Sequence, residues 1–371
     1  MRFPEFTDEW KESVLSDFVE RVKRKNKNNL CKLPLTISAQ YGLVDQISFF
    51  NKVIASENMS NYYLLHKGDF AYNKSYSSEY PWGAIKRLDC YEQGTLSSLY
   101  ICFKPYSHVS SDFLTHYFET SKWHQGISEI AVEGARNHGL LNVGIQDFFE
   151  TRHCLPQSLL EQEKIAKFLN LIEERIATQN KIIYKLKSLI RGIAQHCIKE
   201  STSGNTYVKL GDICQITTGK LDANAQVDNG IYPFFTCAEQ PFKIDSFAFD
   251  TEALLISGNG ANLGYINYYK GKFNAYQRTY VLDLFSENIQ YIKWALKVLL
   301  PKRIAIEKSS SNTPYIVLST LTDLRLPIPC KSKQSFIANL MQSLERKLSN
   351  QIAQYDSYNY LKQYLLRQMF I

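Results

Sequence analysis

The sequence lacks the features of a membrane, secreted or disulfide-stabilised protein. Its 371 residues contain no apolar run of about 18 residues, and the opening segment Met1–Phe6 carries no apolar stretch of the kind found in signal peptides. The eight cysteines form no Cys-x-x-Cys pair. We therefore expect a soluble cytoplasmic protein with reduced thiols.

Sequence patterns typical of a catalytic or metal site are also missing. Gly219-Lys220 is followed by Leu221, so no phosphate-binding loop is formed. His153-Cys154 and His196-Cys197 are adjacent pairs with no second pair nearby, so we expect no metal site. These gaps favour a protein that binds rather than one that catalyses.

One near match to an enzyme motif is present. Asn312-Thr313-Pro314-Tyr315 differs by one residue from the Asn-Pro-Pro-Tyr loop with which adenine methyltransferases grip a base. Such enzymes also need a glycine-rich loop for the methyl donor, and Gly258-x-Gly260-x-x-x-Gly264 has the wrong spacing for it. A stand-alone adenine DNA methyltransferase therefore stays as an alternative hypothesis.

What the sequence does contain is a long heptad pattern that occurs twice. Apolar residues alternate at spacings of four and three from Leu160 to Ile198, and adding 172 to each number finds a second series. At about 1.5 Å per residue, each helix would be roughly 60 Å long. The expected core positions are Ile165, Leu169, Ile172, Ile176, Gln179, Ile183 and Leu186, then Ile337, Met341, Leu344, Leu348, Gln351, Tyr355 and Tyr358.

Each long helix follows a globular segment, and these segments also resemble each other. Leu15-Ser16-Asp17 returns as Leu210-Gly211-Asp212 near the start of the second half. The aromatic content of 13% favours sheets in both segments. We expect domains at 1–157 and 201–331, followed by long helices at 158–200 and 332–371. Two helices reached through separate domains can pair antiparallel within the chain.

Local patterns predict the main elements of the domains. Strands are expected at 62–72, with a turn at 67–69, and at 99–103, 253–256 and 279–284. Short helices are expected at 112–120 and 288–300. Extended ladders are expected at 143–156 and 316–329, each ending at a proline that releases the chain into the long helix.

The loops between these elements carry residues suited to reading DNA bases. Arg can bridge guanine, and Asn or Gln can bridge adenine, in the major groove. Asn and Ser are also common turn formers, so each residue alone is weak evidence. The candidate DNA-binding residues are Lys74, Tyr76, Trp82, Arg136, Asn137 and His138 in the first half, and Asn259, Asn262, Gln277, Arg278, Lys308, Ser311 and Asn312 in the second.

A net charge of +7 makes an acidic partner plausible. A basic segment follows the first Leu-small-Asp motif; it is either a solvated loop or a phosphate contact. Its cations are Arg21, Lys23, Arg24, Lys25, Lys27 and Lys32.

Together these residues resemble the specificity subunits of type I restriction-modification systems. The resemblance rests on the opening segment Arg2–Trp10, the Leu-small-Asp motifs, the segments Cys154–Pro156 and Leu326–Pro329, and Glu161-Gln162 at the start of the first long helix. The second helix has Lys333-Gln334 at the same place. The match covers the whole chain in the order recognition domain, helix, recognition domain, helix.

The resemblance implies an α+β fold with two mixed α/β target-recognition domains and an antiparallel intramolecular coiled coil. It implies a non-catalytic subunit in which each domain reads half of a bipartite site in double-stranded DNA, while the helices set the spacer. Two methyltransferase subunits would dock on it and restriction subunits would join, bringing S-adenosylmethionine, ATP and Mg²⁺. A further alternative is a coiled-coil adaptor that does not bind DNA.

The repeat also makes a local prediction. Gln179 and Gln351 occupy the middle of the two heptad series. Equivalent central positions meet in an antiparallel pair, so we expect these two side chains to approach each other and fix the register at some cost in stability.

Overall fold

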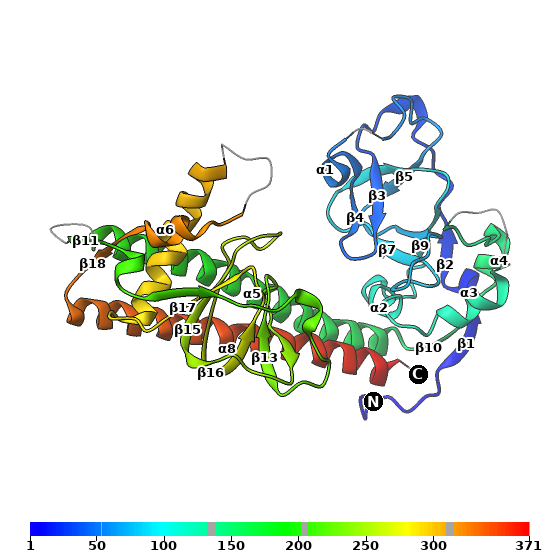
Figure 1. Cartoon of the computed structure of the whole chain (residues 1–371). Coiled ribbons are helices and arrows are strands. Elements are labelled where there is room, and N and C mark those ends of the chain that lie inside the picture. Colours follow the sequence, from blue (N-terminus) through cyan, green and yellow to red (C-terminus); the bar gives the residue numbers. More distant parts are fainter. Residues whose placement is uncertain (53, 132–138, 202–205, 309–314, 371) are drawn as a thin grey trace. The chain divides into compact units, whose positions relative to one another are not determined.

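The structure, a computed structural model, describes residues 1–52, 54–131, 139–201, 206–308 and 315–370. The chain divides into two compact units, one of residues 1–178 with 355–371 and the other of residues 179–354. Two long helices, α5 (Leu159–Glu200) and α8 (Lys331–Met369), contribute to both units (Figure 1). The predicted α+β class and the predicted long helices are confirmed.

The first unit is built on a four-stranded sheet in the order β2-β9-β6-β7. Three two-stranded pairs, β1-β10, β3-β4 and β5-β8, accompany it. The strands are β1 (Lys11–Val14), β2 (Val19–Arg21), β3 (Leu35–Ser38), β4 (Gly42–Asp45), β5 (Tyr63–His66), β6 (Phe70–Asn73), β7 (Ala84–Arg87), β8 (Gln93–Leu96), β9 (Ile101–Pro105) and β10 (Arg152–Leu155). The short helices are α1 (Gln46–Phe50), α2 (Ser111–Tyr117), α3 (His124–Ile130) and α4 (Ile145–Phe149).

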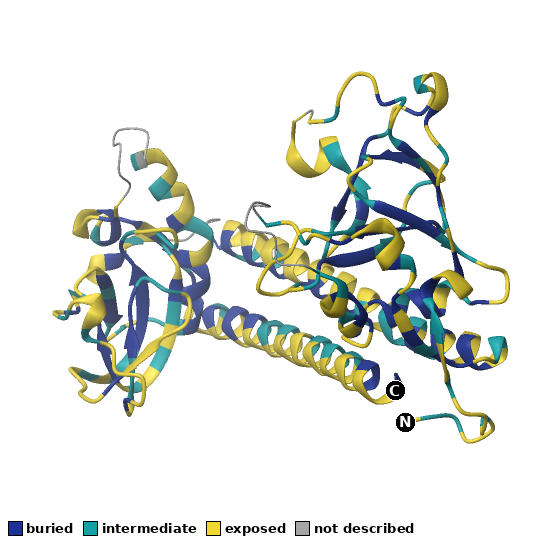
Figure 2. Cartoon of the chain, turned by 90° about the vertical axis from the view of Figure 1, so that its right-hand side faces the viewer, coloured by how far each residue is buried: buried dark blue, intermediate teal, exposed yellow. Residues whose placement is uncertain are grey.

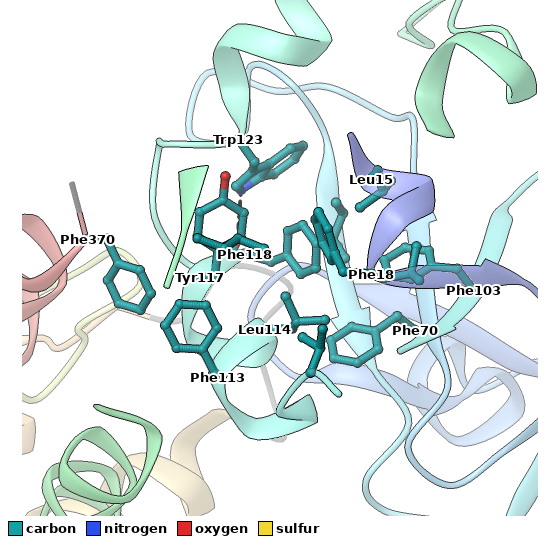
Figure 3. Packing of buried hydrophobic residues seen from close by; sticks show 14 of the residues in the cluster. Leu15, Phe18, Phe70, Phe103, Phe113, Leu114, Tyr117, Phe118, Trp123 and Phe370 are labelled. Atoms are coloured by element: carbon teal, nitrogen blue, oxygen red, sulfur yellow. Dashed lines mark hydrogen bonds between the residues drawn. The ribbon is translucent and has the colours of Figure 1, made fainter. Parts of the chain in front are cut away.

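Aromatic side chains form the main core of this unit (Figure 3). Phe70 and Phe103 stack across neighbouring strands with ring centroids 5.4 Å apart. The buried Trp123 donates from Nε1 to the carbonyl of Phe118 at 3.0 Å. Phe370 at the end of the chain packs into the same core. The end of α8 is therefore part of the first unit's core.

The second unit is built on a six-stranded sheet in the order β12-β17-β15-β16-β13-β14. The central strand β15 buries both faces, because Leu254 and Ile256 enter one core while Ala253 and Leu255 enter another. The strands are β11 (Thr206–Lys209), β12 (Gln215–Thr218), β13 (Tyr232–Phe235), β14 (Phe242–Ile244), β15 (Phe249–Ser257), β16 (Ile266–Ala275), β17 (Thr279–Asp283) and β18 (Arg325–Ile328), and the helices are α6 (Ile289–Lys308) and α7 (Leu318–Thr322).

The two long helices pair antiparallel. In the first unit Ile165 near the start of α5 shares a core with Leu365 near the end of α8. In the second unit Ile190 near the end of α5 shares a core with Ile337 near the start of α8. Buried and half-buried residues alternate with exposed ones along both helices (Figure 2). Each core position named from the heptads is buried or half-buried.

The expected polar layer lies within this pair. Gln179 is buried, with 7% of its surface exposed, and its Nε2 donates to Oε1 of Gln351 at 3.1 Å and to the Gln351 carbonyl at 2.9 Å. The prediction that these two residues meet is confirmed. Gln179 Nε2 also donates to Oε1 of Gln354, at 3.4 Å.

The repeat is also visible in the backbone. Strand β1 pairs antiparallel with β10, and β11 pairs antiparallel with β18. The residues after β1 and β11 then make the same bond: Leu15 N donates to Thr151 O, and Leu210 N donates to Leu324 O, both at 2.9 Å. Each domain thus closes by pairing its first strand with the strand that leads into its long helix.

The two predicted extended ladders are wrong in their first parts. Residues 145–149 form helix α4 and residues 318–322 form helix α7, and only β10 and β18 are extended. Short apolar runs fit both periods, and Ile145 with Phe148 has helical spacing as well. In the helical conformation, Phe148 of α4 and Leu321 of α7 are buried in their cores.

The short helices also differ from the prediction. Helix α6 continues through Pro301 to Lys308, although proline usually ends a helix because it lacks an N–H. An ion pair of 2.6 Å between Arg303 and Glu307 spans the turn beyond the proline. Helix α2 is shorter than expected, and α3 was not anticipated. The turn at Gly68 is confirmed, with φ +91°, but β5 and β6 pair with other strands rather than with each other.

Candidate nucleic-acid interface

The first unit presents one described loop with candidate DNA-binding residues, directly after β6. The Lys74 carbonyl accepts from Leu141 N at 2.9 Å, and Tyr76 N donates to the Gly139 carbonyl at 3.1 Å. Tyr76 is half exposed at 50%. The structure therefore holds the loop of Lys74 and Tyr76 beside residues 139–141, which follow the second candidate loop in sequence.

The same loop ends at a glycine that no other residue can replace without strain. Gly83 has φ +77°, and a Cβ on it would lie 2.1 Å from the Asn73 carbonyl oxygen. Trp82 beside it is half-buried and packs against the first core, and its carbonyl accepts from Tyr72 Oη at 2.9 Å. Trp82 thus helps to anchor this loop on the domain.

The second unit brings several candidate loops together. Gly258 N, at the end of β15, donates to the Arg278 carbonyl at 2.8 Å, and Ile316 N donates to the Gly258 carbonyl at 2.9 Å. The side chain of Gln277 donates from Nε2 to Asp222 Oδ1 at 2.8 Å. Gln277 and Arg278 are both exposed. The loops after β15 and β16 and the segment that begins at Tyr315 are therefore neighbours.

Two residues of this cluster were missed in the sequence. Cys237, which follows β13, contacts Asn259 Oδ1 through its Sγ at 3.0 Å, and its carbonyl accepts from Asn262 Nδ2 at 3.0 Å. Asp222 accepts the hydrogen bond from Gln277 Nε2. Their only sequence clue is that each stands in a polar stretch beside a strand, which describes many surface residues.

Some predicted residues fall outside the described part of the chain. These are Arg136, Asn137, His138, Ser311 and Asn312. The backbone of Lys308 ends α6, while its side chain is outside the description. The assignment of these residues to DNA contact stays a prediction.

The basic segment near the start is only partly a solvated loop. Arg24 forms an ion pair with the buried Asp69, and Lys25 Nζ lies 3.8 Å from the centre of the Tyr63 ring. Burial raises the pKa of Asp69, opposed by the nearby Arg24. Four cations of the segment are exposed, namely Lys23, Lys25, Lys27 and Lys32, and all but the Tyr63-bound Lys25 can contact phosphates freely.

The buried histidines serve the fold. Burial lowers the pKa of His153 to about 4, and its two ring nitrogens contact Tyr117 Oη at 2.9 Å and Thr151 Oγ1 at 2.8 Å. His116, also with a lowered pKa through burial, contacts Asn170 of α5 at 2.8 Å. Among the described residues no group of three His, Cys, Asp or Glu side chains could hold a metal ion.

Both long helices begin with the same buried contact. Gln162 donates from Nε2 to the Pro156 carbonyl at 2.8 Å and accepts from Ser110 N at 2.8 Å. Gln334 donates to the Pro329 carbonyl at 2.8 Å and accepts from Asn288 N at 3.0 Å. Each glutamine therefore ties the start of a long helix to the preceding strand and to the start of α2 or α6.

The preceding residues differ between the repeats. Glu161 accepts from Arg2 at 2.6 and 2.8 Å and from Trp10 Nε1 at 3.1 Å. Lys333 instead donates to the Glu200 carbonyl at 3.2 Å. The glutamine contact is thus duplicated, while Glu161 binds the N-terminal segment and has no equivalent in the second half.

These features define a class of protein: a duplicated scaffold of two loop-bearing domains, each joined to one helix of an antiparallel pair. Within the described residues, no helix is long and apolar enough to cross a membrane. Comparisons with known proteins agree with this class. Residues 202–355 match the family model of the type I restriction modification DNA specificity domain.

Relatives and solved structures extend the match. The specificity subunit of the type I restriction enzyme EcoDI from Escherichia coli is 44% identical over 137 residues, which are 37% of this chain and 30% of that subunit. This chain therefore covers less than a third of the length of that curated relative. The S subunit of a type I restriction-modification system from M. genitalium has a TM-score of 0.63 at 16% identity, over 100% of this chain and 99% of that one.

A second solved chain, from work on complex assembly and conformational transition of the type I restriction-modification system, has a TM-score of 0.58 at 17% identity, over 98% and 97% of the two chains. The chain has the fold of these solved S subunits. The predicted sequence resemblance to type I specificity subunits is confirmed for residues 202–355 by the specificity-domain match.

Proposed function

We propose that this chain is the DNA-recognition subunit of a type I restriction-modification complex. Each globular domain reads one half of a bipartite duplex site, and the antiparallel helices set the spacer between the halves. The observation that carries the proposal is the duplication of a loop-bearing domain and a long helix, down to the paired Gln162 and Gln334 contacts. The specificity-domain match at 202–355 supports it.

The chemistry belongs to other subunits in this proposal. Two methyltransferase subunits dock on the helices and domains and transfer methyl groups from S-adenosylmethionine to an adenine in each half-site. Restriction subunits that use ATP and Mg²⁺ join for cleavage. This chain supplies recognition and assembly, and it performs no reaction itself.

The proposal is tested by variants that affect one half-site at a time. Lys74→Ala lies in the first unit and Arg278→Ala in the second. Binding of the assembled complex to a duplex carrying its site should weaken about tenfold with each variant, because one contact to a base or phosphate is worth about 1–3 kcal/mol. Duplexes with one half-site scrambled should show that each variant has lost discrimination in a different half.

Lys67→Ala is the matched control. Lys67 lies on the turn between β5 and β6 and pairs with Glu92, so this variant should leave binding unchanged. Unaltered affinity and base preference in both variants would show that the site residues are misassigned. Affinity of the parent complex that does not fall with added salt would favour the adaptor hypothesis, because phosphate contacts make DNA binding strongly salt-dependent.

A further inference from the structure

Three segments of the second unit meet around one thiol. Cys237 follows β13, Asn259 and Asn262 lie in the loop between β15 and β16, and Arg278 precedes β17. Cys237 and both asparagines are half-buried, while Arg278 is exposed. The Arg278 carbonyl accepts from Gly258 N at 2.8 Å, so the segment that carries Arg278 is tied to the loop that carries Asn259.

The thiol fixes the orientation of the Asn259 amide. A thiol has a single hydrogen, and Sγ lies 3.0 Å from Asn259 Oδ1 and 3.6 Å from the Arg278 carbonyl. An amide oxygen accepts a hydrogen bond far better than sulfur does, so the amide places Oδ1 rather than Nδ2 against Sγ. The Nδ2 hydrogens of Asn259 are then at the opposite end of the amide, away from Cys237.

The Asn262 amide is held the other way round. Its Nδ2 donates to the Cys237 carbonyl at 3.0 Å. Its Oδ1 therefore lies at the end of the amide away from Cys237. The two asparagines present opposite hydrogen-bonding groups because they bind two different atoms of the same cysteine.

We propose that Cys237 is a positioning residue that sets Asn259 as a hydrogen-bond donor and Asn262 as an acceptor toward base edges in one half-site. The inference rests on the proposed function. It departs from the simple expectation that each asparagine bridges an adenine alone. The donor fits N7 or O6 of guanine, N7 of adenine or O4 of thymine, and the acceptor fits the amino group of adenine or cytosine.

The test uses the full chain assembled with its methyltransferase partners. Duplexes that carry the preferred site are randomised one position at a time, and the bound fraction is sequenced for the parent, Cys237→Ser and Cys237→Ala. Cys237→Ser should keep all base preferences, because a hydroxyl donates to Asn259 Oδ1 as the thiol does. Cys237→Ala should reduce discrimination about tenfold at one or two adjacent positions of a single half-site.

Cys330→Ala is the control, since Cys330 is an exposed cysteine of the same unit and should behave like the parent. Unchanged base preferences in the other half-site would show that each variant is folded. Cys237→Ala with every preference intact would overturn the inference, as would Cys237→Ser behaving like Cys237→Ala. A parent complex without any base preference would overturn both the inference and the proposed function.

Asn259→Asp provides a second test of the proposed donor role of Asn259. The carboxylate can only accept hydrogen bonds, so the preference at the contacted position should shift toward a base with an amino group, such as cytosine. An unchanged preference at every position would count against a donor role for Asn259.

Discussion

At the scale of single residues, two buried polar side chains fix how the long helices join their domains. Gln162 and Gln334 are 3% and 0% exposed, and each amide is bonded at both ends. Buried amides are stable only when they are paired, because an unmade bond inside a protein carries the full desolvation penalty. The two glutamines therefore hold α2 and α6 against the starts of the long helices.

Truncating either glutamine should be costly. Gln162→Ala leaves Ser110 N and the Pro156 carbonyl without their partner, and Gln334→Ala does the same to Asn288 N and the Pro329 carbonyl. We expect each to lower the free energy of unfolding by about 3 kcal/mol, measured by denaturant titration. The exposed Gln342→Ala on α8 is the control and should change little. A loss below about 0.5 kcal/mol for both would refute the structural role, since that is the usual size of a surface change.

His153 gives the first unit a pH dependence of known sign. Its folded pKa of about 4 lies below the usual value of 6.5, so the unfolded chain takes up a proton first as the pH falls. Stability from this group is complete above pH 6.5 and is lost progressively down to about pH 4, by about 3 kcal/mol. His153→Gln should flatten the stability profile in that window. An equal slope in parent and variant would contradict the assignment.

At the scale of elements, the long helices were predictable and the short ones were not. The heptads that end near Ile198 and Met369 repeat the same information many times, so one exception such as Lys362 does not obscure them. Lys362 is half-buried at its heptad position, and its Nζ pairs with Glu173 of α5 at 2.6 Å. By contrast, α4 and α7 have five residues each, too few to distinguish a helical from an extended period.

The loop cluster of the second unit was only half predictable for a related reason. Asn259, Asn262 and Arg278 have suitable chemistry and could be named from the sequence. Cys237 acts through the orientation of two amides, and that orientation depends on backbone segments brought together from 22 and 25 residues away. No local pattern encodes such a contact.

The paired helices make a prediction about the spacer. Seven residues inserted in α5 after Ile176 add about 10 Å and break the pairing of Gln179 with Gln351, so assembly with the methyltransferase subunits should fail or the preferred spacer should change. A second heptad inserted in α8 after Gln351, which lies opposite the first insertion, restores the pairing of Gln179 with Gln351. That double variant should prefer a spacer about three base pairs longer. Recognition by the single-insertion variant with an unaltered spacer would refute the role of the helices as a ruler.

At the scale of the whole molecule, duplication gives the proposed recognition subunit its two loop-bearing domains. The first strand of each half pairs with the strand before its long helix, and the same buried glutamine follows in both. The loops have diverged around this shared frame, with Lys74 and Tyr76 in one half and the Cys237 cluster in the other. A conserved frame with different loops is what two unlike half-sites require.

In the proposed function, this chain determines which DNA sequence its complex modifies. Mapping methylated adenines across the genome in cells with and without the intact chain tests it most directly. We expect a bipartite motif with one methylated adenine in each half and a fixed spacer. The motif should be present only with the chain and should be relaxed in a single half by Cys237→Ala. An identical methylation pattern in cells that lack the chain would contradict it.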